Sequence, residues 1–186
     1  MDYHSIALSG LPASGKSTLV SKLSLSLRWE ARGIGEIWRQ RHKEEAPHIK
    51  FDKYWANSSI EKNRKINEAF LEIVNAGKVI ADTRYAHIYS YKTLKVFLTA
   101  PLTVRALRAF SNKTKVEFRD MNLPDIETLL QKREQDEVVM GQKLYGLNYD
   151  YRAPEHYDLT LDSGLMNVEQ EYNEILKELE HKKSFK

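Results

Sequence analysis

The stretch that decides the fold of this chain is GLPASGKS, residues 10–17. It fits the pattern G-x-x-x-x-G-K-[ST] without a mismatch; an apolar run, Ser5–Leu8, precedes it, and a helical pattern built on Leu19, Leu23 and Leu27 follows it. In this context the glycines let consecutive backbone N–H groups converge on one surface, and the helix N-terminus adds about half a positive charge there. The stretch therefore predicts a site for the phosphates of a nucleoside triphosphate.

The side chains of this loop have separate predicted tasks. Lys16 places an ammonium on the β- and γ-phosphates, and the Ser17 hydroxyl ligates Mg²⁺. ATP and Mg²⁺ are therefore the expected cosubstrate and cofactor. The residues expected to bind the triphosphate are Gly10, Ala13, Ser14, Gly15, Lys16, Ser17 and Thr18.

Outward from the loop, apolar runs alternate with helical patterns. The runs predict five strands, at 5–8, 30–34 (the weakest), 79–81, 95–99 and 158–161. Helical spacing of apolar residues is found at 66–74 before Gly77, after Pro101, and at 168–179. This alternation predicts a three-layer α/β/α fold around a mostly parallel five-stranded sheet.

Two polar stretches, residues 35–75 and 111–152, interrupt the alternation. The first is largely helical, and the second is rich in charge and poor in core residues. Since neither holds enough apolar residues to fold alone, we expect one domain over residues 1–186. Both stretches are then insertions that cover a site at the carboxyl ends of the strands.

Composition narrows the class of protein. The 186 residues include no cysteine, which excludes disulfide scaffolds, thiolate zinc sites and cysteine nucleophiles, and the six histidines show no metal-ligand spacing. The net charge of +3 is only mildly basic. No apolar run approaches the ~20 residues that span a bilayer, and the first residues do not resemble a signal peptide, so we expect a soluble cytoplasmic protein without a membrane partner.

Arginines near the predicted crevice indicate phosphoryl transfer, which needs positive charge around the migrating group. Arg39 lies shortly after the second predicted strand, and Arg84 ends the sequence Asp82-Thr83-Arg84 behind a buried strand. Asp82 either orients Mg²⁺-bound water or pairs with Lys16 or Arg84. The sequence has no Asn-Lys-x-Asp motif for the recognition of guanine, which argues against a GTPase switch. Among proteins with a phosphate loop, the small phosphotransferases remain.

Four segments, in their order, resemble the nucleoside monophosphate kinases and most of all the short cytidylate kinases of the archaeal type. They are Ile6–Thr18, Gly35–Arg39, Val79–Arg84 and Lys95–Arg105. Two weaker similarities follow in the same order, around Lys132–Glu134 with Tyr145-Gly146 and at Tyr157–Asp162.

The resemblance implies roles for individual residues. Arg39 and Arg84 would hold a monophosphate acceptor, and Arg133 would come down from a mobile lid onto the transferring phosphate, so that Lys16, Arg84 and Arg133 act in catalysis. The first insertion would be the acceptor-binding arm and the second the lid. The segment Arg105–Asn112 would approach the base of ATP.

The sequence departs from the family's pattern in three places. Asp82-Thr83 stand where the family usually has glutamate and glycine, Asp136–Gln142 lacks the second arginine of the lid, and Ser111-Asn112 replace a further arginine. Either another cation substitutes, or the acceptor is not a standard nucleotide. The candidate substitutes are Arg152, Lys143 and Lys113.

The leading hypothesis is the phosphorylation of CMP or dCMP by ATP, carried out by a monomer or homodimer. One alternative is a kinase of a small metabolite or a polynucleotide end, with Asp82 as the base. Another is a nucleotide-binding regulatory protein with a degenerate lid. Residues 102–119 hold five basic side chains against one acidic, interleaved with Phe110 and Phe118, so contact with nucleic acid is weighed against a solvated lid hinge, and the hinge is favoured.

Overall fold

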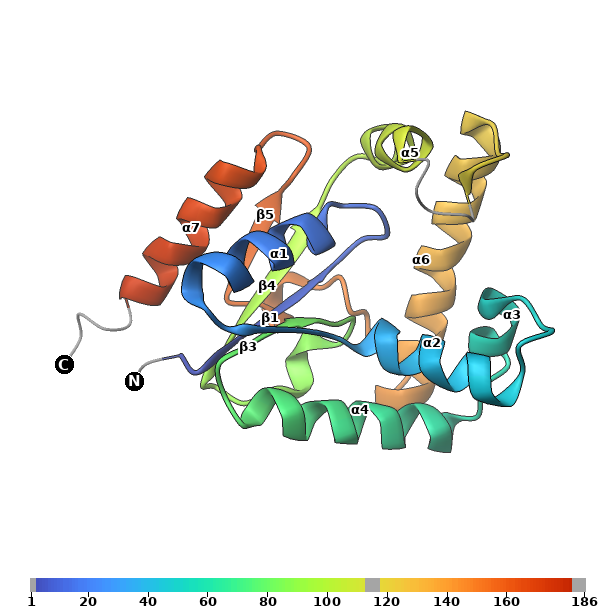
Figure 1. The fold of residues 1–186 in the computed structure, drawn as a ribbon, viewed down its shortest axis with the longest axis horizontal. Coiled ribbons are helices and arrows are strands. Elements are labelled where there is room, and N and C mark those ends of the chain that lie inside the picture. The colour runs from blue at the N-terminus through green and yellow to red at the C-terminus, as the bar shows by residue number, and fades with distance from the viewer. Residues whose placement is uncertain (1–2, 113–117, 182–186) are drawn as a thin grey trace.

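The computed structural model describes residues 3–112 and 118–181. Strands and helices alternate along the chain as the sequence predicts, with three helices inside the first insertion and one long helix inside the second (Figure 1). The elements are β1 (Ser5–Gly10), α1 (Lys16–Leu27), β2 (Glu30–Gly33), α2 (Ile34–Glu45), α3 (Phe51–Ala56), α4 (Ile60–Asn75), β3 (Val79–Asp82), η1 (Ala86–Ile88), β4 (Thr93–Thr99), α5 (Leu102–Ser111), α6 (Leu123–Tyr145), η3 (Pro154–His156), β5 (Leu159–Asp162) and α7 (Val168–His181).

The five strands form one parallel sheet in the order β2-β3-β1-β4-β5. The chain leaves β1 towards β2 and β3 on one side and later crosses to β4 on the other. Parallel sheets open a ligand crevice at such a change of direction, outside the carboxyl ends of the strands. The register pairs Leu8 of β1 with Asp82 of β3, so the phosphate loop and the residues after β3 leave the sheet at the same edge.

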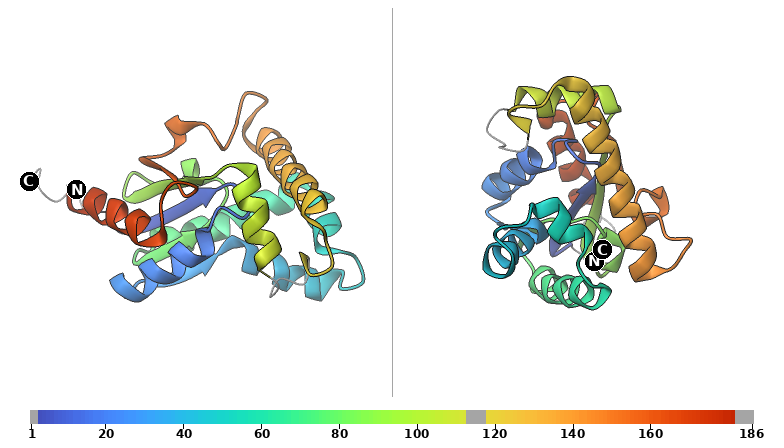
Figure 2. Two further views of the ribbon diagram at one scale, coloured as in Figure 1. Left: turned by 90° about the horizontal axis from the view of Figure 1, so that it is seen from above. Right: turned by 90° about the vertical axis from the view of Figure 1, so that its right-hand side faces the viewer.

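Helices cover both faces of the sheet, which confirms the predicted three-layer fold. Helices α1 and α7 pack on one face, where Leu19 and Ile175 are fully buried. On the other face α4 and α6 join an aromatic cluster that includes Tyr85 and Tyr151. In the right-hand view of Figure 2, α6 lies across the front of the sheet, beyond the carboxyl ends of the strands.

The expectation that residues 111–152 are poor in core residues is wrong. The 23-residue helix α6 reaches two cores: its first half packs against α5, and its second half joins the aromatic cluster below the sheet. Because the other faces of α6 carry charged side chains, the composition of this stretch does not reveal its apolar stripe. The buried apolar side chains of the described part of this stretch are Phe118, Ile126, Leu130, Val138, Met140, Leu144, Tyr149 and Tyr151.

Within the described ranges, no helix combines the length and the apolar character needed to cross a membrane.

Candidate active site

A cavity of about 1240 Å³ opens at the carboxyl ends of β1 and β3. Its walls come from the phosphate loop, from α2 and α3, from the residues after β3, and from α5, α6 and the start of α7. The cavity brings together every residue that the sequence nominated for phosphate, acceptor or metal. These residues are Gly10, Ala13, Ser14, Gly15, Lys16, Ser17, Thr18, Arg39, Asp82, Arg84 and Arg133.

The phosphate loop has a backbone that few side chains allow. Gly10 has φ 145°, and a Cβ there would lie 2.3 Å from the backbone oxygen of Leu98. Gly15 has φ 102° at the N-cap of α1 and supplies no side-chain cap, so the first N–H groups of the helix are left for another acceptor. The Ser14 hydroxyl oxygen is buried and has no hydrogen-bond partner among the described residues. A polyphosphate fits this set of donors.

Lys16 lies over the loop that it follows. Its Nζ donates to the backbone oxygens of Gly10 at 2.7 Å and Leu11 at 3.1 Å. Ser17 and Thr18 are exposed in the first turn of α1 and face the same cavity. The ammonium and the two hydroxyls are therefore accessible to a ligand bound at the helix N-terminus.

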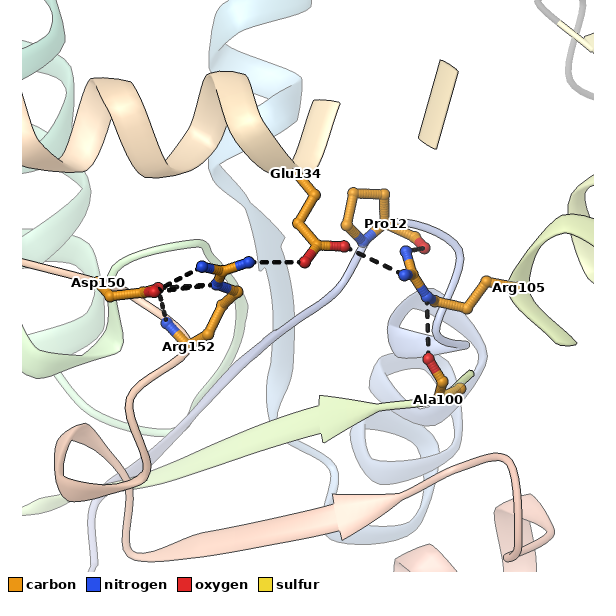
Figure 3. A network of polar contacts seen from close by, with 6 residues as sticks. All are labelled: Pro12, Ala100, Arg105, Glu134, Asp150 and Arg152. Carbon is orange, nitrogen blue, oxygen red and sulfur yellow. Dashed lines mark hydrogen bonds and ion pairs between the residues drawn. The ribbon is translucent and has the colours of Figure 1, made fainter. Parts of the chain in front are cut away.

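Arg105 ties the phosphate loop to α6 (Figure 3). The side chain is buried, and it donates from Nε to the Ala100 oxygen at 3.0 Å, from Nη1 to the Pro12 oxygen at 3.2 Å, and from Nη2 to Glu134 at 3.1 Å. Glu134 also accepts from Arg152 at 2.8 Å. Arg105 thus supports the loop from behind and does not line the cavity, whereas Arg108, Ala109 and Asn112 do.

Arg108 makes a second connection to the loop. Its Nη1 donates to the Ser14 oxygen at 3.2 Å and to the Ser163 hydroxyl at 2.9 Å. Ser163 in turn donates to the Ser14 oxygen at 2.6 Å. Of the five basic side chains counted for a nucleic-acid surface, Arg105 is therefore buried, and the exposed Arg108 binds the phosphate loop and Ser163.

Arg84 extends from the end of β3 into the cavity. Its Nε donates to Oε1 of Glu137 on α6 at 2.6 Å, and its guanidinium lies 4.8 Å from the ring centre of Trp55 on α3. Burial alone would lower the pKa of Arg84, but the Glu137 carboxylate outweighs it and the pKa is raised, so the side chain stays charged. The partner of Arg84 is Glu137 and not Asp82, which leaves Asp82 half-buried at the cavity wall.

Two further arginines reach the cavity from the insertions. Arg39 is an exposed residue of α2 whose guanidinium folds back over Gly35. Arg133 of α6 lies with its guanidinium 5.7 Å from the ring centre of Phe118. Lys43 and Lys132, which the sequence reading did not select, also line the cavity.

The structure does not bring two of the suggested substitute cations into the cavity. Arg152 is held by Asp150 and Glu134, and Lys143 is exposed; neither lines the cavity. The third, Lys113, falls outside the described residues.

The stretch Asp136–Gln142 has little room for the family's second lid arginine at its buried positions. Met140 is buried, and a Cβ on Gly141 would lie 2.8 Å from the ring of Tyr149. Met140 and Gly141 therefore serve packing.

Glu137 and Trp55 are the functional candidates that sequence reasoning missed. Glu137 is one helical turn after Arg133, a spacing that could have placed it at the cavity. No local signal links Trp55 to Arg84, because the contact joins two separate elements.

A magnesium ion fits the oxygen donors of the site. Among the described residues there is no cluster of three or more acidic or histidine side chains that could hold a metal alone. Mg²⁺ in such sites is bound by one or two protein oxygens together with substrate phosphates and water. Ser17 and Asp82, which face the same cavity, can supply those oxygens.

Comparison with known families and sequences gives a consistent result. The model of the cytidylate kinase-like family matches residues 5–165. The cytidylate kinase of Ignicoccus hospitalis is 28% identical over 166 residues, which are 88% of this chain and 92% of that protein. The cytidylate kinase of Archaeoglobus fulgidus is 28% identical over 180 residues, 96% of each chain.

Solved structures share the fold at low sequence identity. A protein of Eubacterium ventriosum described as uncharacterized superposes with a TM-score of 0.69 at 15% identity, covering 96% of this chain and 98% of that one. The shikimate kinase of Aquifex aeolicus superposes with a TM-score of 0.53 at 24% identity, covering 98% and 99%. At these identities the likeness concerns the P-loop kinase fold.

Proposed function

The chain belongs to the cytidylate kinase-like family, and on this premise we propose that it transfers the γ-phosphoryl group of ATP to a nucleoside monophosphate, with CMP and dCMP as the first acceptors to test. Its kinase character follows from the family and the fold. The choice of a pyrimidine monophosphate is the proposal. With ATP as its donor, the enzyme is proposed to act in the cytoplasm.

The observation that carries this proposal is the convergence of cations on one cavity. The phosphate loop contributes Lys16, α2 contributes Arg39, the end of β3 contributes Arg84, and α6 contributes Arg133. A transferring phosphoryl group and a phosphorylated acceptor together bring several negative charges, and arginine forks bind phosphate oxygens in pairs. Four cations from four parts of the chain can bind the triphosphate of ATP and the phosphate of an acceptor placed in line with it.

The division of labour follows from these positions. We assign the acceptor phosphate to Arg39 and Arg84, and the migrating phosphoryl group to Lys16, Arg84 and Arg133. The attacking oxygen of a monophosphate is already ionised near neutral pH, so no side chain needs to remove a proton. Residues 35–75 then form the acceptor-binding arm and residues 111–152 the lid of a single domain, closing to exclude water.

Ser17 and Asp82 are the proposed magnesium residues. Bound Mg²⁺ bridges phosphate oxygens and neutralises the charge that develops on them. The Ser17 hydroxyl would ligate the ion directly, and Asp82 would accept hydrogen bonds from its water ligands.

The test is ADP formation from Mg-ATP with each of the nucleoside monophosphates in turn, with Lys16→Met as the inactive control. Turnover confined to CMP, dCMP or UMP supports the proposal. Turnover stimulated only by a hydroxyl acceptor, such as a polyol or a polynucleotide 5′ end, rejects it. ATP binding without acceptor-stimulated ADP formation rejects it in favour of a regulatory nucleotide-binding protein.

A further inference from the structure

Arg84 is held at three points: its backbone oxygen, one edge of its guanidinium and one face of it. The Ser9 hydroxyl of β1 donates to the Arg84 backbone oxygen at 2.6 Å, which fixes where the side chain starts. Oε1 of Glu137 accepts from Nε at 2.6 Å, and the Trp55 ring lies 4.8 Å from the guanidinium carbon. The backbone, one edge and one face of the group are therefore positioned by three different elements.

Glu137 is itself fixed in place. The residue is buried, and its backbone oxygen accepts a hydrogen bond from the Tyr85 hydroxyl at 3.1 Å. One turn further along α6, Gly141 packs closely against the rings of Tyr149 and Tyr85. Two successive residues after β3, Arg84 and Tyr85, thus bind the side chain and the backbone of Glu137.

The contacts leave one edge of Arg84 for a ligand. The Glu137 bond uses Nε, and neither terminal nitrogen of Arg84 has a hydrogen-bond partner among the described residues. The edge that carries the two terminal nitrogens is one that can bind two phosphate oxygens at once. Because a free arginine loses considerable rotamer entropy on binding, an arginine held beforehand binds its ligand more tightly.

We propose that Glu137 and Trp55 are positioning residues that orient the Arg84 guanidinium so that its terminal nitrogens grip the phosphate of the acceptor. The inference rests on the proposed function, since it needs an acceptor that carries a phosphate. Trp55 lies in the proposed acceptor-binding arm and Glu137 in the proposed lid. The two insertions therefore meet at one cation, and both line the cavity beside it.

Two substitutions at Glu137 distinguish the effect of its side-chain length from the effect of its charge. Glu137→Gln keeps the length of the side chain and an oxygen that accepts from Nε, whereas Glu137→Asp keeps the charge and loses a methylene. Positioning predicts that the aspartate variant raises the acceptor KM by about tenfold and the glutamine variant by only about threefold, with the KM for ATP unchanged in both. The matched control is Glu127→Gln on the same helix, away from the cavity.

The same experiment can overturn the inference. A merely electrostatic role of Glu137 would leave the aspartate variant closer to wild type than the glutamine variant. A merely structural ion pair would lower the melting temperature and shift both KM values together. Either result rejects a positioning role for Glu137.

Trp55 provides a readout that does not depend on turnover. A phosphate that binds Arg84 changes the charge beside the indole of Trp55. Titration with CMP, or with inorganic phosphate as the simpler probe, is therefore expected to change the fluorescence emission of Trp55 until the site is saturated. The change should persist in Trp29→Phe, because Trp29 packs with the core on the other face of the sheet, and it should vanish in Trp55→Phe and in Arg84→Gln.

The fluorescence titration keeps the two proposals apart. Absence of turnover with every nucleoside monophosphate rejects the proposed function, and a saturable Trp55 signal with inorganic phosphate would still support the positioning of Arg84. If neither CMP nor phosphate changes the emission of the wild-type protein, or if Trp55→Phe gives the same signal as wild type, the inference is overturned even where CMP is turned over.

Discussion

The phosphate loop and helix α6 face each other across the same cavity, but they are built in opposite ways. The loop is shaped by its own backbone geometry, and its lysine makes local contacts: Lys16 binds carbonyl oxygens five and six residues earlier in the chain. The contacts of α6 join side chains far apart in sequence, 29 residues between Arg105 and Glu134 and 53 between Arg84 and Glu137. A local motif can be recognised from its own spacing, whereas a distant pair is recognised only once the fold is known.

The largest effect is expected from a substitution that changes the phosphate loop and leaves α6 intact. Lys16→Met should lower kcat by about 10³-fold or more, because the ammonium is the loop's own cation for the migrating phosphoryl group. The fold should remain, since the side chain is half-buried and its hydrogen bonds to Gly10 and Leu11 lie within the loop. ADP formation and a thermal melt measured on the same sample check this; a large loss of stability would contradict it.

The next prediction concerns a substitution that removes the connection between the phosphate loop and α6. Arg105→Met removes a buried cation that binds Pro12, Ala100 and Glu134, and we expect a loss of about 3 kcal/mol in the free energy of unfolding. The KM for ATP should rise as well, because the loop loses its support. Denaturant unfolding and steady-state kinetics test the two effects, and Lys177→Met, at an exposed ion pair on α7, is the matched control.

A third substitution probes the acceptor arm. Arg39→Ala should raise the acceptor KM by about tenfold, as expected for one lost charge-assisted contact, and leave the KM for ATP unchanged. Arg41→Ala, on the same helix but paired with Glu45, is the control. An unaltered acceptor KM in the Arg39 variant would remove Arg39 from the acceptor site.

The aromatic cluster under α6 should make this side of the molecule sensitive to acid. Burial, reinforced by the charges of His156 and Lys95, lowers the pKa of His87 to about 4, against about 6.5 for an unperturbed histidine. The unfolded chain therefore binds the proton first, so the stability contribution is complete above pH ~6.5 and is lost as the pH falls towards ~4.

Melting temperatures measured across this window test the prediction. In His87→Gln the decline should be shallower than in wild type, because the glutamine cannot be protonated. His48→Gln, at an exposed position, is the control. Parallel melting curves for wild type and His87→Gln would refute the assignment.

The smallest effect is expected at Arg152. The side chain pairs with Asp150 and Glu134 near the surface, so Arg152→Ala should cost no more than about 1 kcal/mol and change kcat little. If Arg152 instead replaced the missing arginine of the lid, kcat would fall by about 10³-fold. Single-turnover rates decide between the two.

The sequence predicted the loop side well for a physical reason. Strand, glycine turn and helix follow one another within about twenty residues, and each step has its own signature in the chain. All five strands were predicted: four of them are short apolar runs, as buried parallel strands are, whereas β2 is a largely exposed strand at the edge of the sheet and gave the weakest signal.

The α6 side was predicted less well. Its charged residues suggested a lid poor in core residues, but Glu134 and Glu137 bind arginines from other elements, and apolar residues before and after this pair join two cores. The role of Arg105 could not be read from α5 alone, because the carbonyl groups that it binds belong to the loop and to the residue after β4.

Gly141 has a consequence for how this enzyme can change over evolution. A side chain at that position would collide with Tyr149, so no single substitution there is neutral while Tyr149 stays as it is. The two sites are therefore expected to be epistatic: a lineage that acquires a larger residue at position 141 needs a smaller side chain at position 149. Related chains should therefore carry either the small residue with the large ring or the reverse pair, and rarely a mixture.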